Sequence, residues 1–495
     1  PRTAILQKDK WRCIDDGRRS KHNAATRMRE RITCGRADFP LVVSRAFARI
    51  LSSRRYQSQR AGGGVWKRRR MGHSTCDLEA AYRKVTTQQP QYTCVAVWDP
   101  DQRKVRYCDL YGHNFGLLSA VTNFNRFPEL ATAAARRLLW VVTEHYFDDN
   151  DIAEPEWADG SGMRALKRLC GDEFFGFAFD DDQDSPWGPV NEYLGVVSGL
   201  PEVDRGSMTV DVSEARRDKI KLLAEQSLSS TRLASGGASS LFGKARFMMS
   251  PCYGAVGKAC LQPIKQRQGQ PGRTDLDPYL RDSLEFVSFV CDRLPALTLP
   301  ILPPAGDKVV VFTDAEGKKR RGDRIPSGHV GYVVYHPDHG VVHGHAPVPR
   351  ALVELMDRLK KRDVYIGQFE LCAAITPFVS LPADWFAGRS VELWVDNSGA
   401  IGALTKGYSG VPDCARIVNM FHFAIAKLGL ASLWIDYVPS ESNPADIPSR
   451  VHAMSAQEAE TALAGLGIQA PLTIPKFCDE LGDWLSFSKI ASSVW

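Results

Sequence analysis

Short apolar runs alternate with segments of helical periodicity along most of the chain. In the first part, the runs at 94–98 and 193–197 have strand length, whereas segments 20–55 and 126–147 have the spacing of helices. From about residue 211 onward, apolar positions recur at helical spacing. The pattern predicts an α+β region followed by a separate, mainly helical unit.

A proline-rich segment separates this region from another domain. Residues 295–306 hold four prolines in twelve positions, too many for a helix or a central strand, and so predict a linker. Six elements follow it, with strands at 309–312, 331–335, 391–395 and 433–438 and helices at 369–378 and 413–428. The order β-β-α-β-α-β predicts a mixed sheet with helices on its faces. A partly helical tail is expected beyond residue 453.

The composition is that of a globular chain long enough for roughly two to four cored domains, with 495 residues, 44% hydrophobic and 24% charged. It contains no apolar run long enough to span a membrane and no secretory signal, so we expect an intracellular protein, cytoplasmic or nuclear. The 12 cysteines form no C-x-x-C pair, which favours reduced thiols. Because the chain begins at Pro1, we expect a cleaved or truncated piece of something longer.

Positive charge is concentrated near the beginning of the chain. Residues 1–70 hold 20 Lys or Arg against 5 Asp or Glu, whereas the net charge of the whole chain is only +6. Arg54, Arg55, Arg60 and the run 67–70 could neutralise the phosphates of a polyanion. A disordered basic loop or a nuclear-import signal explains the same residues equally well.

Four acidic residues interrupt or adjoin apolar stretches of the last domain: Asp314, Glu370, Asp396 and Asp446. Each acid taken singly is more simply a helix cap or a turn residue. If the sheet gathers them, however, their mutual repulsion requires divalent cations. Mg²⁺ is the expected ion, with Mn²⁺ as an alternative, and two ions about 4 Å apart would clamp a phosphodiester for in-line displacement.

The surrounding motifs strengthen this interpretation. The segments are 312–315 (FTDA), 370–374 (ELCAA), 395–397 (VDN) and 443–450 (NPADIPSR). They resemble the RNase H domain of retroelement polyproteins, and the resemblance implies cleavage of the RNA strand of an RNA–DNA hybrid. One departure is Tyr437, which stands where many members of that family carry a histidine.

A second acidic set lies in the first part of the chain. Asp77 belongs to the segment 76–82 (CDLEAAY), and Asp148 and Asp149 end the segment 146–149 (YFDD), which has the pattern of a hairpin tip. Carboxylates in this arrangement could hold two metal ions around a primer 3′-hydroxyl and an incoming triphosphate. The spacing therefore makes them candidates for nucleotidyl transfer.

Further segments appear in the order typical of one family. They are 11–18 (WRCIDDGR), 76–82, 115–120 (FGLLSA), 146–149, 193–196 (YLGV) and 241–247 (LFGKARF). As a set they resemble the reverse transcriptases, the last segment being similar to the thumb of DIRS-like elements. Two departures are the absence of any lysine between Lys167 and Lys219, and the polar Glu144 and His145 before the YFDD turn.

The resemblance implies a role for each matching residue. Asp77, Asp148 and Asp149 would be the catalytic metal ligands, and Tyr82 the gate that rejects a ribose 2′-hydroxyl. Arg12 would bind the triphosphate, with Lys8 or Lys10 as its partner, and Arg18 in the same hairpin would also bind substrate. Phe115 and Gly116 would position the template and the nucleotide. The acidic run 180–184 has the pattern of a solvated loop, and we assign it no chemistry.

Together, the two resemblances imply a retroelement (LTR or DIRS-like) RNA-directed DNA polymerase with RNase H activity. Each active site would hold two Mg²⁺. The expected partners are an RNA template, a DNA primer, an RNA–DNA hybrid and dNTPs. The polymerase is expected to be an α+β right hand, with fingers and palm over 1–210 and a helical thumb over 211–270. A connection over 271–305 would join it to an α/β RNase H-like domain over 306–452. A tail would follow over 453–495. Two alternatives stay open: a catalytically decayed copy, and a non-enzymatic RNA-binding scaffold. The oligomeric state is not indicated.

Overall fold

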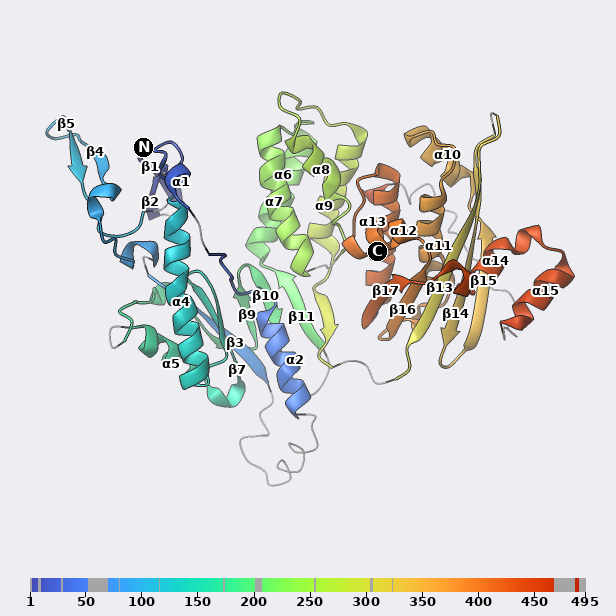
Figure 1. Ribbon diagram of the computed structural model, residues 1–495, viewed down its shortest axis with the longest axis horizontal. Coiled ribbons are helices and arrows are strands. Elements are labelled where there is room, and N and C mark those ends of the chain that lie inside the picture. Colours follow the sequence, from blue (N-terminus) through green and yellow to red (C-terminus); the bar gives the residue numbers. More distant parts are fainter. Residues whose placement is uncertain are drawn as a thin grey trace, which may run out of the picture. The chain divides into compact units, whose positions relative to one another are not determined.

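The chain divides into two compact units, Pro1–Thr209 and Val210–Trp495 (Figure 1). The computed structural model describes residues 2–7, 10–27, 30–51, 70–79, 81–114, 116–171, 174–200, 207–252, 255–302, 306–322, 324–466 and 486–488. Among these residues, no helix combines the length and the apolar character that crossing a membrane requires.

The first unit is built on a four-stranded antiparallel sheet in the order β6-β7-β3-β8. These strands are Thr143–Tyr146, Asp149–Pro155, Met71–Asp77 and Ser185–Gly188. Helices α4 (Leu118–Leu138) and α5 (Ser161–Cys170) pack against the sheet, and their apolar faces share one core with it. This core fixes the ends of β3 and β7, where the second acidic set lies.

Smaller elements surround this sheet. Three hairpins are formed by β1 and β2 (Arg2–Gln7, Lys10–Asp15), β4 and β5 (Val95–Asp99, Lys104–Cys108), and β9 and β10 (Val190–Tyr193, Val196–Gly199). The remaining helices are α1 (His22–Ala25) and α2 (Phe39–Leu51), with 3-10 turns η2 (Ala81–Lys84), η3 (Pro90–Thr93), η4 (Glu156–Ala158) and η5 (Asp181–Gln183).

Three sequence predictions for this unit were wrong in extent. The helix expected over 126–147 ends at Leu138, and its last residues form strand β6. The helix expected over 20–55 is reduced, in the described residues, to α1 and α2. The strand expected over 193–197 is broken by a turn in which Leu194 and Gly195 have φ of 53° and 78°. Short apolar runs do not distinguish a strand from the two arms of a hairpin, because both are apolar.

The second unit begins with a helical bundle. Its helices are α6 (Glu214–Ser229), α7 (Ser235–Cys252), α8 (Leu261–Gln268) and α9 (Pro278–Arg293). Helix α6 packs on α9, and α7 packs on α8. The Asp277 side chain caps α9 by accepting a hydrogen bond from the Leu280 N–H at 2.9 Å.

The proline-rich segment is not only a linker. It contains β12 (Leu297–Pro300), which lies at the edge of a sheet beside β11 (Ser207–Val212). Proline is tolerated at such an edge because the missing N–H is not needed for a further strand.

A five-stranded mixed sheet follows, in the order β15-β14-β13-β16-β17. Its strands in chain order are β13 (Val309–Lys318), β14 (Ser327–His336), β15 (Gly340–Pro347), β16 (Ser390–Val395) and β17 (Ser432–Tyr437). The pairs among β13, β14 and β15 are antiparallel, whereas β16 is parallel to β13 and β17 is parallel to β16. The mixed sheet predicted from the sequence is confirmed.

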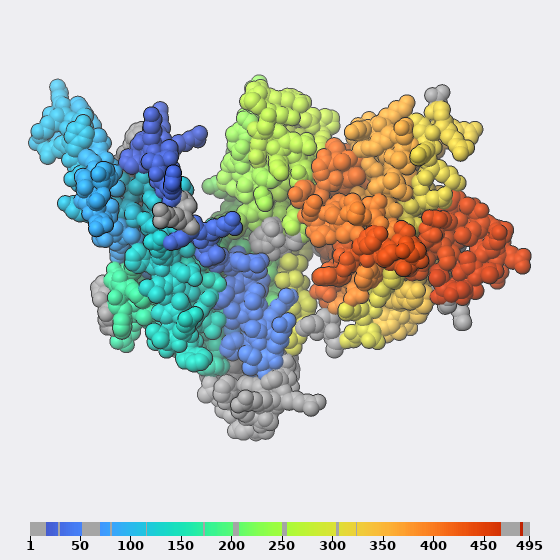
Figure 2. Space-filling model, in the orientation of Figure 1, coloured from blue at the N-terminus to red at the C-terminus, as the bar shows by residue number. Residues whose placement is uncertain are grey.

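Helices accompany this sheet. They are α10 (Arg350–Leu359), α11 (Ile366–Ser380), α12 (Ser398–Lys406), α13 (Pro412–Leu428), α14 (Asp446–Arg450) and α15 (Ala456–Gly465), with 3-10 turns η6 (Ala383–Trp385), η7 (Ser440–Ser442) and η8 (Val451–Ala453). Helix α11 packs on β13, β14 and α13, and almost all of its side chains are buried. Within this unit, the surface of the green bundle borders that of the orange helices (Figure 2), and Phe286 of α9 contacts Phe423 of α13 with ring centroids 6.0 Å apart.

The predicted element order omitted β15, α10 and α12. The β15 sequence, GVVHGHAP, mixes glycine, histidine and proline and lacks a continuous apolar run. It forms a strand because β14 offers it a complete antiparallel partner, from His336 opposite Gly340 to His329 opposite Pro347. Tertiary pairing here overrides weak local propensity.

Candidate active sites

Three carboxylates converge at one end of the five-stranded sheet. Asp314 lies on β13, Glu370 lies on α11, and Asp396 directly follows β16. Each contributes one oxygen atom to a group in which all the oxygens lie within 4.8 Å of one another. Strands β13 and β16 are parallel, with Thr313 opposite Val395, so Asp314 in the middle of β13 lies beside Asp396, where β16 ends. We call these three residues the acidic triad.

The acidic triad is electrostatically unfavourable without a cation. Asp314 and Glu370 are only 5% and 4% exposed. Burial, reinforced by the charges of Asp314 and Asp396, raises the pKa of Glu370 to about 9. Burial also raises the pKa of Asp314 to about 6, against the opposing hydrogen bond from Ser449. Such a cluster holds protons unless a divalent ion replaces them.

Neighbouring side chains orient two of the three carboxylates. Ser449 Oγ donates a hydrogen bond to Asp314 Oδ2 at 2.5 Å, and Ser440 Oγ donates one to Asp396 Oδ2 at 3.0 Å. By contrast, the buried Glu370 Oε2 has no hydrogen-bond partner among the described residues. A buried acceptor without a donor costs free energy, and a cation would remove that cost.

The fourth predicted acid is not part of the triad. Asp446 begins α14 and forms an ion pair with Arg450, at 2.6 Å, one helical turn further on. Its charge nevertheless contributes to the raised pKa of Asp314, so it lies near the triad. Tyr437, at the end of β17, is 50% exposed. The structure therefore gathers three of the four acids and leaves the fourth beside them, held by Arg450.

The second acidic set is brought together through the backbone. Asp77 ends β3 and pairs directly with Asp149, the first residue of β7. The Leu78 N–H donates to the Asp148 carbonyl at 3.1 Å. In the described part of the chain, however, only the acidic triad brings three carboxylate oxygens within 4.8 Å. Asp77, Asp148 and Asp149 thus share adjacent strand ends, with their carboxylates further apart.

The acidic run 180–184, to which the sequence analysis assigned no chemistry, adjoins this second set. The Asp180 N–H donates to the Asp77 carbonyl at 2.9 Å, and Gln183 Nε2 donates to Asp77 Oδ2 at 3.1 Å. Lys167 of α5 bridges the run, with Nζ 2.6 Å from Asp181 Oδ1 and also bonded to Asp184. The interpretation as a solvated loop was incomplete, because the run supports Asp77.

Tyr82 lies near Asp148, whereas Gly116 contacts the segment at Asn23. Tyr82, in η2, packs edge-on against Phe124 with ring centroids 5.1 Å apart. Burial first, and then the charge of Asp148, raises the pKa of Tyr82 to about 12. Gly116 has a φ of 101°, and its carbonyl accepts a hydrogen bond from Asn23 Nδ2 at 3.0 Å. Phe115 lies outside the described residues.

The predicted triphosphate contacts are described only in part. Lys10 and Arg12 lie on β2, whose side chains lie outside the described residues, as does Lys8. Arg18 is exposed in the turn after β2, and its N–H donates to Asp16 Oδ1 at 3.1 Å. These three substrate-binding assignments stay predictions.

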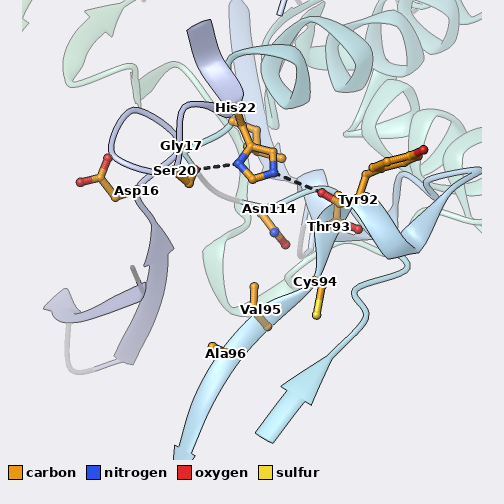
Figure 3. Close-up of a pocket in the computed structure, with 11 residues that line it drawn as sticks. Asp16, Gly17, Ser20, His22, Tyr92, Thr93, Cys94, Val95, Ala96 and Asn114 are labelled. Atoms are coloured by element: carbon orange, nitrogen blue, oxygen red, sulfur yellow. Dashed lines mark hydrogen bonds between the residues drawn. The ribbon is translucent and has the colours of Figure 1, made fainter. Parts of the chain in front are cut away.

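A pocket of about 140 Å³ with a mixed polar and apolar lining adjoins this turn, and no motif of the sequence predicted it. Figure 3 shows the segment around Asp16 and His22 facing the segment from Tyr92 to Ala96. The His22 ring connects the two, with Nδ1 2.7 Å from Ser20 Oγ and Nε2 3.2 Å from the Tyr92 carbonyl. This contact joins the first hairpin region to η3.

The polar residues before the YFDD turn have partners on α4. Glu144 forms an ion pair with Arg136 at 3.1 Å, and His145 Nδ1 lies 3.0 Å from Thr132 Oγ1. Strand β6 therefore accommodates polar side chains because the facing helix supplies matching groups. This departure from the family pattern does not disturb the sheet.

No protein-family model matches the chain, and no curated protein matches it either. Among solved structures, it is similar to the foamy viral protease-reverse transcriptase dRH in complex with ds DNA, with a TM-score of 0.43 and 12% identity, covering 96% of this chain and 65% of that one. It is also similar to the foamy viral protease-reverse transcriptase in complex with RNA/DNA hybrid, with a TM-score of 0.41 and 11% identity, covering 93% of this chain and 73% of that one. The chain thus spans less than two thirds of the first of these proteins.

Proposed function

We propose that this chain is a retroelement RNA-directed DNA polymerase with a fused RNase H, in which a right-hand fold of fingers, palm and thumb precedes the nuclease. The observation that carries the proposal is the acidic triad, in which Asp314 and Glu370 are buried beside the end of β16 and Glu370 Oε2 lacks a hydrogen-bond donor among the described residues. The motifs around each acid, which resemble those of RNase H and reverse transcriptases, support the same function.

The nuclease site fits a divalent cation. Its donors are carboxylate oxygens, which Mg²⁺ and Mn²⁺ prefer, and Glu370 has an oxygen that no protein group satisfies. A bound ion would lower the pKa of an attacking water and would neutralise negative charge on the phosphodiester. The protein's own contribution is orientation: Ser449 and Ser440 hold the carboxylates of Asp314 and Asp396. Asp446 would complete the ligand set.

In the polymerase site, Asp77, Asp148 and Asp149 would hold the ions, and the adjacent strand ends of β3 and β7 support this role. Arg12, with Lys10 and Arg18, would neutralise the triphosphate of a dNTP. Tyr82 would exclude a ribose 2′-hydroxyl, while Phe115 and Gly116 would position the template and nucleotide. Sequence information would come from base pairing between the RNA template and the DNA primer.

Two assays on the full chain test the proposal. Primer extension on an RNA template and cleavage of an RNA–DNA hybrid are measured with Mg²⁺. We expect Asp148→Asn to abolish extension and leave cleavage nearly unchanged, and Asp396→Asn to do the reverse. The exposed Asp384→Asn, in η6 and outside both acidic sets, is the matched control and should change neither activity. Loss of both activities from either single variant, in a folded chain, would contradict the two-site assignment.

One observation favours the alternative of a catalytically decayed copy for the polymerase half. The carboxylates of Asp77, Asp148 and Asp149 are not gathered as those of the acidic triad are. The same assays separate the alternatives, because a decayed copy lacks one or both activities. A non-enzymatic scaffold would bind RNA and lack both.

A further inference from the structure

A basic pocket of about 190 Å³ lies in the second unit, away from the acidic triad. Its lining residues come from α7, from α8 and the turn before it, and from the end of α12 and the residues after it. Four of its lining side chains are cationic, two are aromatic and none is acidic: Arg246, Lys258, Lys265 and Lys406, with Phe242 and Tyr408. We call it the junction pocket, because the helical bundle and the nuclease domain build it together.

The two walls are in close contact. Gly407 follows α12 with a φ of +76°, and its N–H closes the helix on Ala403 and Leu404. A Cβ at this position would lie 2.7 Å from Ala255 Cβ and 3.3 Å from Lys258 Cδ. Two features therefore require glycine at position 407: the left-handed backbone conformation, and the close approach of the turn between α7 and α8 to this residue. This packing brings Lys258 and Lys406, from different helical segments, into the lining of one pocket.

The charge in the junction pocket is not neutralised by the protein. Several cations elsewhere in the unit have carboxylate partners, such as Arg320 with Asp357. In the described part of the chain, none of the four pocket cations forms an ion pair. Burial, followed by the charge of Arg246, lowers the pKa of Lys258, and no carboxylate contributes. Converging cations without acids are a site for an anion.

We propose that the junction pocket binds one phosphodiester group of a nucleic-acid strand, with Phe242 and Tyr408 contacting the adjoining sugar or base. The aromatic rings favour a strand over a free phosphate, because a nucleobase or sugar offers them a face to pack against. The identification of the strand as part of a hybrid rests on the proposed function. The pocket would then contact one strand through both the bundle and the nuclease domain.

The test of this proposal is the binding of an RNA–DNA hybrid by the full chain. Binding is measured by fluorescence anisotropy in EDTA, so that no cleavage occurs. The test variant is Arg246→Gln/Lys406→Gln. The matched control is Lys244→Gln/Lys427→Gln, which removes one charge from α7 and one from the nuclease domain outside the pocket. We expect the test variant to bind about tenfold more weakly at moderate salt, with a slope of log K against log[salt] smaller by about 1. The control should change the affinity less than about twofold.

Single methylphosphonate substitutions along each strand locate the contact. We expect one position at which the wild type loses about tenfold in affinity and the test variant loses almost none. Arg246→Lys/Lys406→Arg keeps the charge and should restore binding. Equal losses in wild type and test variant at every position would overturn the proposal.

The anion bound in the pocket could instead be a free phosphate compound. Competition experiments, in which inorganic phosphate or a dNTP displaces the bound hybrid, distinguish this alternative. If the test variant alters only that competition and leaves hybrid binding unchanged, the pocket takes free phosphate compounds and the proposal fails. A wild type that shows the pocket effect but no catalysis would overturn the proposed function alone. A wild type that binds no nucleic acid would overturn both.

Discussion

The buried carboxylates of Asp314 and Glu370 lie within 4.8 Å of each other, although one belongs to a strand and the other to a helix. Burial and the charges of Asp314 and Asp396 raise the pKa of Glu370 to about 9, and burial with the charges of Asp396 and Asp446 raises that of Asp314 to about 6. At neutral pH, the site without an ion therefore retains a proton on Glu370. A divalent cation displaces that proton and relieves the repulsion.

Magnesium should stabilise the second unit through this pair. We expect the unfolding free energy of the wild type to rise by about 2.7 kcal/mol at a Mg²⁺ concentration 100 times its Kd. Glu370→Gln should lose most of this increase, because the amide is a weaker ligand without charge. Thermal melts with and without Mg²⁺ measure the effect. Glu354→Gln, which removes an acid of α10 outside the triad, is the control, and an equal response of both variants would refute the assignment.

Stability without metal should fall as the pH rises. The folded pKa of Glu370 is about 9, above the ordinary value of 4.5, so the folded chain binds more protons than the unfolded chain between these values. The unfolding free energy then decreases with pH over this window, by at most about 1.4 kcal/mol per pH unit for one proton. Urea unfolding in EDTA from pH 5 to 8 measures the slope. Glu370→Gln should flatten it, and an unchanged slope would show that another group titrates.

Lys167 should control the charge beside Asp77. Its ammonium group neutralises Asp181 and Asp184, and Lys167→Met would leave both carboxylates uncompensated next to the proposed nucleotide site. We expect the KM for dNTPs to rise about threefold to tenfold, because added negative charge repels the triphosphate. Hybrid cleavage should not change. Lys219→Met, an exposed lysine of α6, is the control for general loss of charge.

Tyr82 should set the selectivity for deoxyribonucleotides. Replacing it with valine opens space beside Asp148, whose charge acts on the Tyr82 hydroxyl. We expect Tyr82→Val to raise the ratio of ribonucleotide to deoxyribonucleotide incorporation by roughly tenfold or more, as removal of a steric clash does. Single-nucleotide extension kinetics measure this ratio. Tyr92→Val, at an exposed tyrosine, should leave it unchanged.

Phe487 should be essential for the stability of the second unit. Its side chain is fully buried and stacks on Tyr279 of α9, with centroids 5.7 Å apart. The Asp282 carboxylate accepts hydrogen bonds from the N–H groups of Phe487 and Ser488 at 2.8 and 3.0 Å. We expect Phe487→Ala to cost about 3–5 kcal/mol in unfolding free energy, measured by urea denaturation. The exposed Phe174→Ala is the control, and a similar small cost for both would contradict this role.

The sequence indicated those elements whose residues carry a strong local pattern. The strands around Val311, Leu393 and Ile435 are apolar runs, and the structure has β13, β16 and β17 there. Strand β15 and helices α10 and α12 were missed. Their formation depends on partners supplied by other segments, as β14 supplies the partner of β15.

The acids of the candidate sites could also be chosen from the sequence, because carboxylates beside apolar runs are unusual and the motifs around them resemble known families. Their distances could not. Asp446 forms an ion pair with Arg450. The hydrogen bond from Gln183 to Asp77 connects two positions that are 106 residues apart in the sequence. The junction pocket likewise depends on Gly407 meeting Ala255.

The amino-acid order by itself determined the strands β13, β16 and β17, which contain apolar runs, the positions of the acids beside them, and the families that their motifs resemble. Only the tertiary structure decided that three acids meet in a buried triad, that Lys167 compensates the acidic run, and that Phe487 returns to α9. The reason is physical: hydrophobic periodicity is a local property of the chain, whereas the energy of a carboxylate depends on which charges and donors the fold brings within a few ångströms of it.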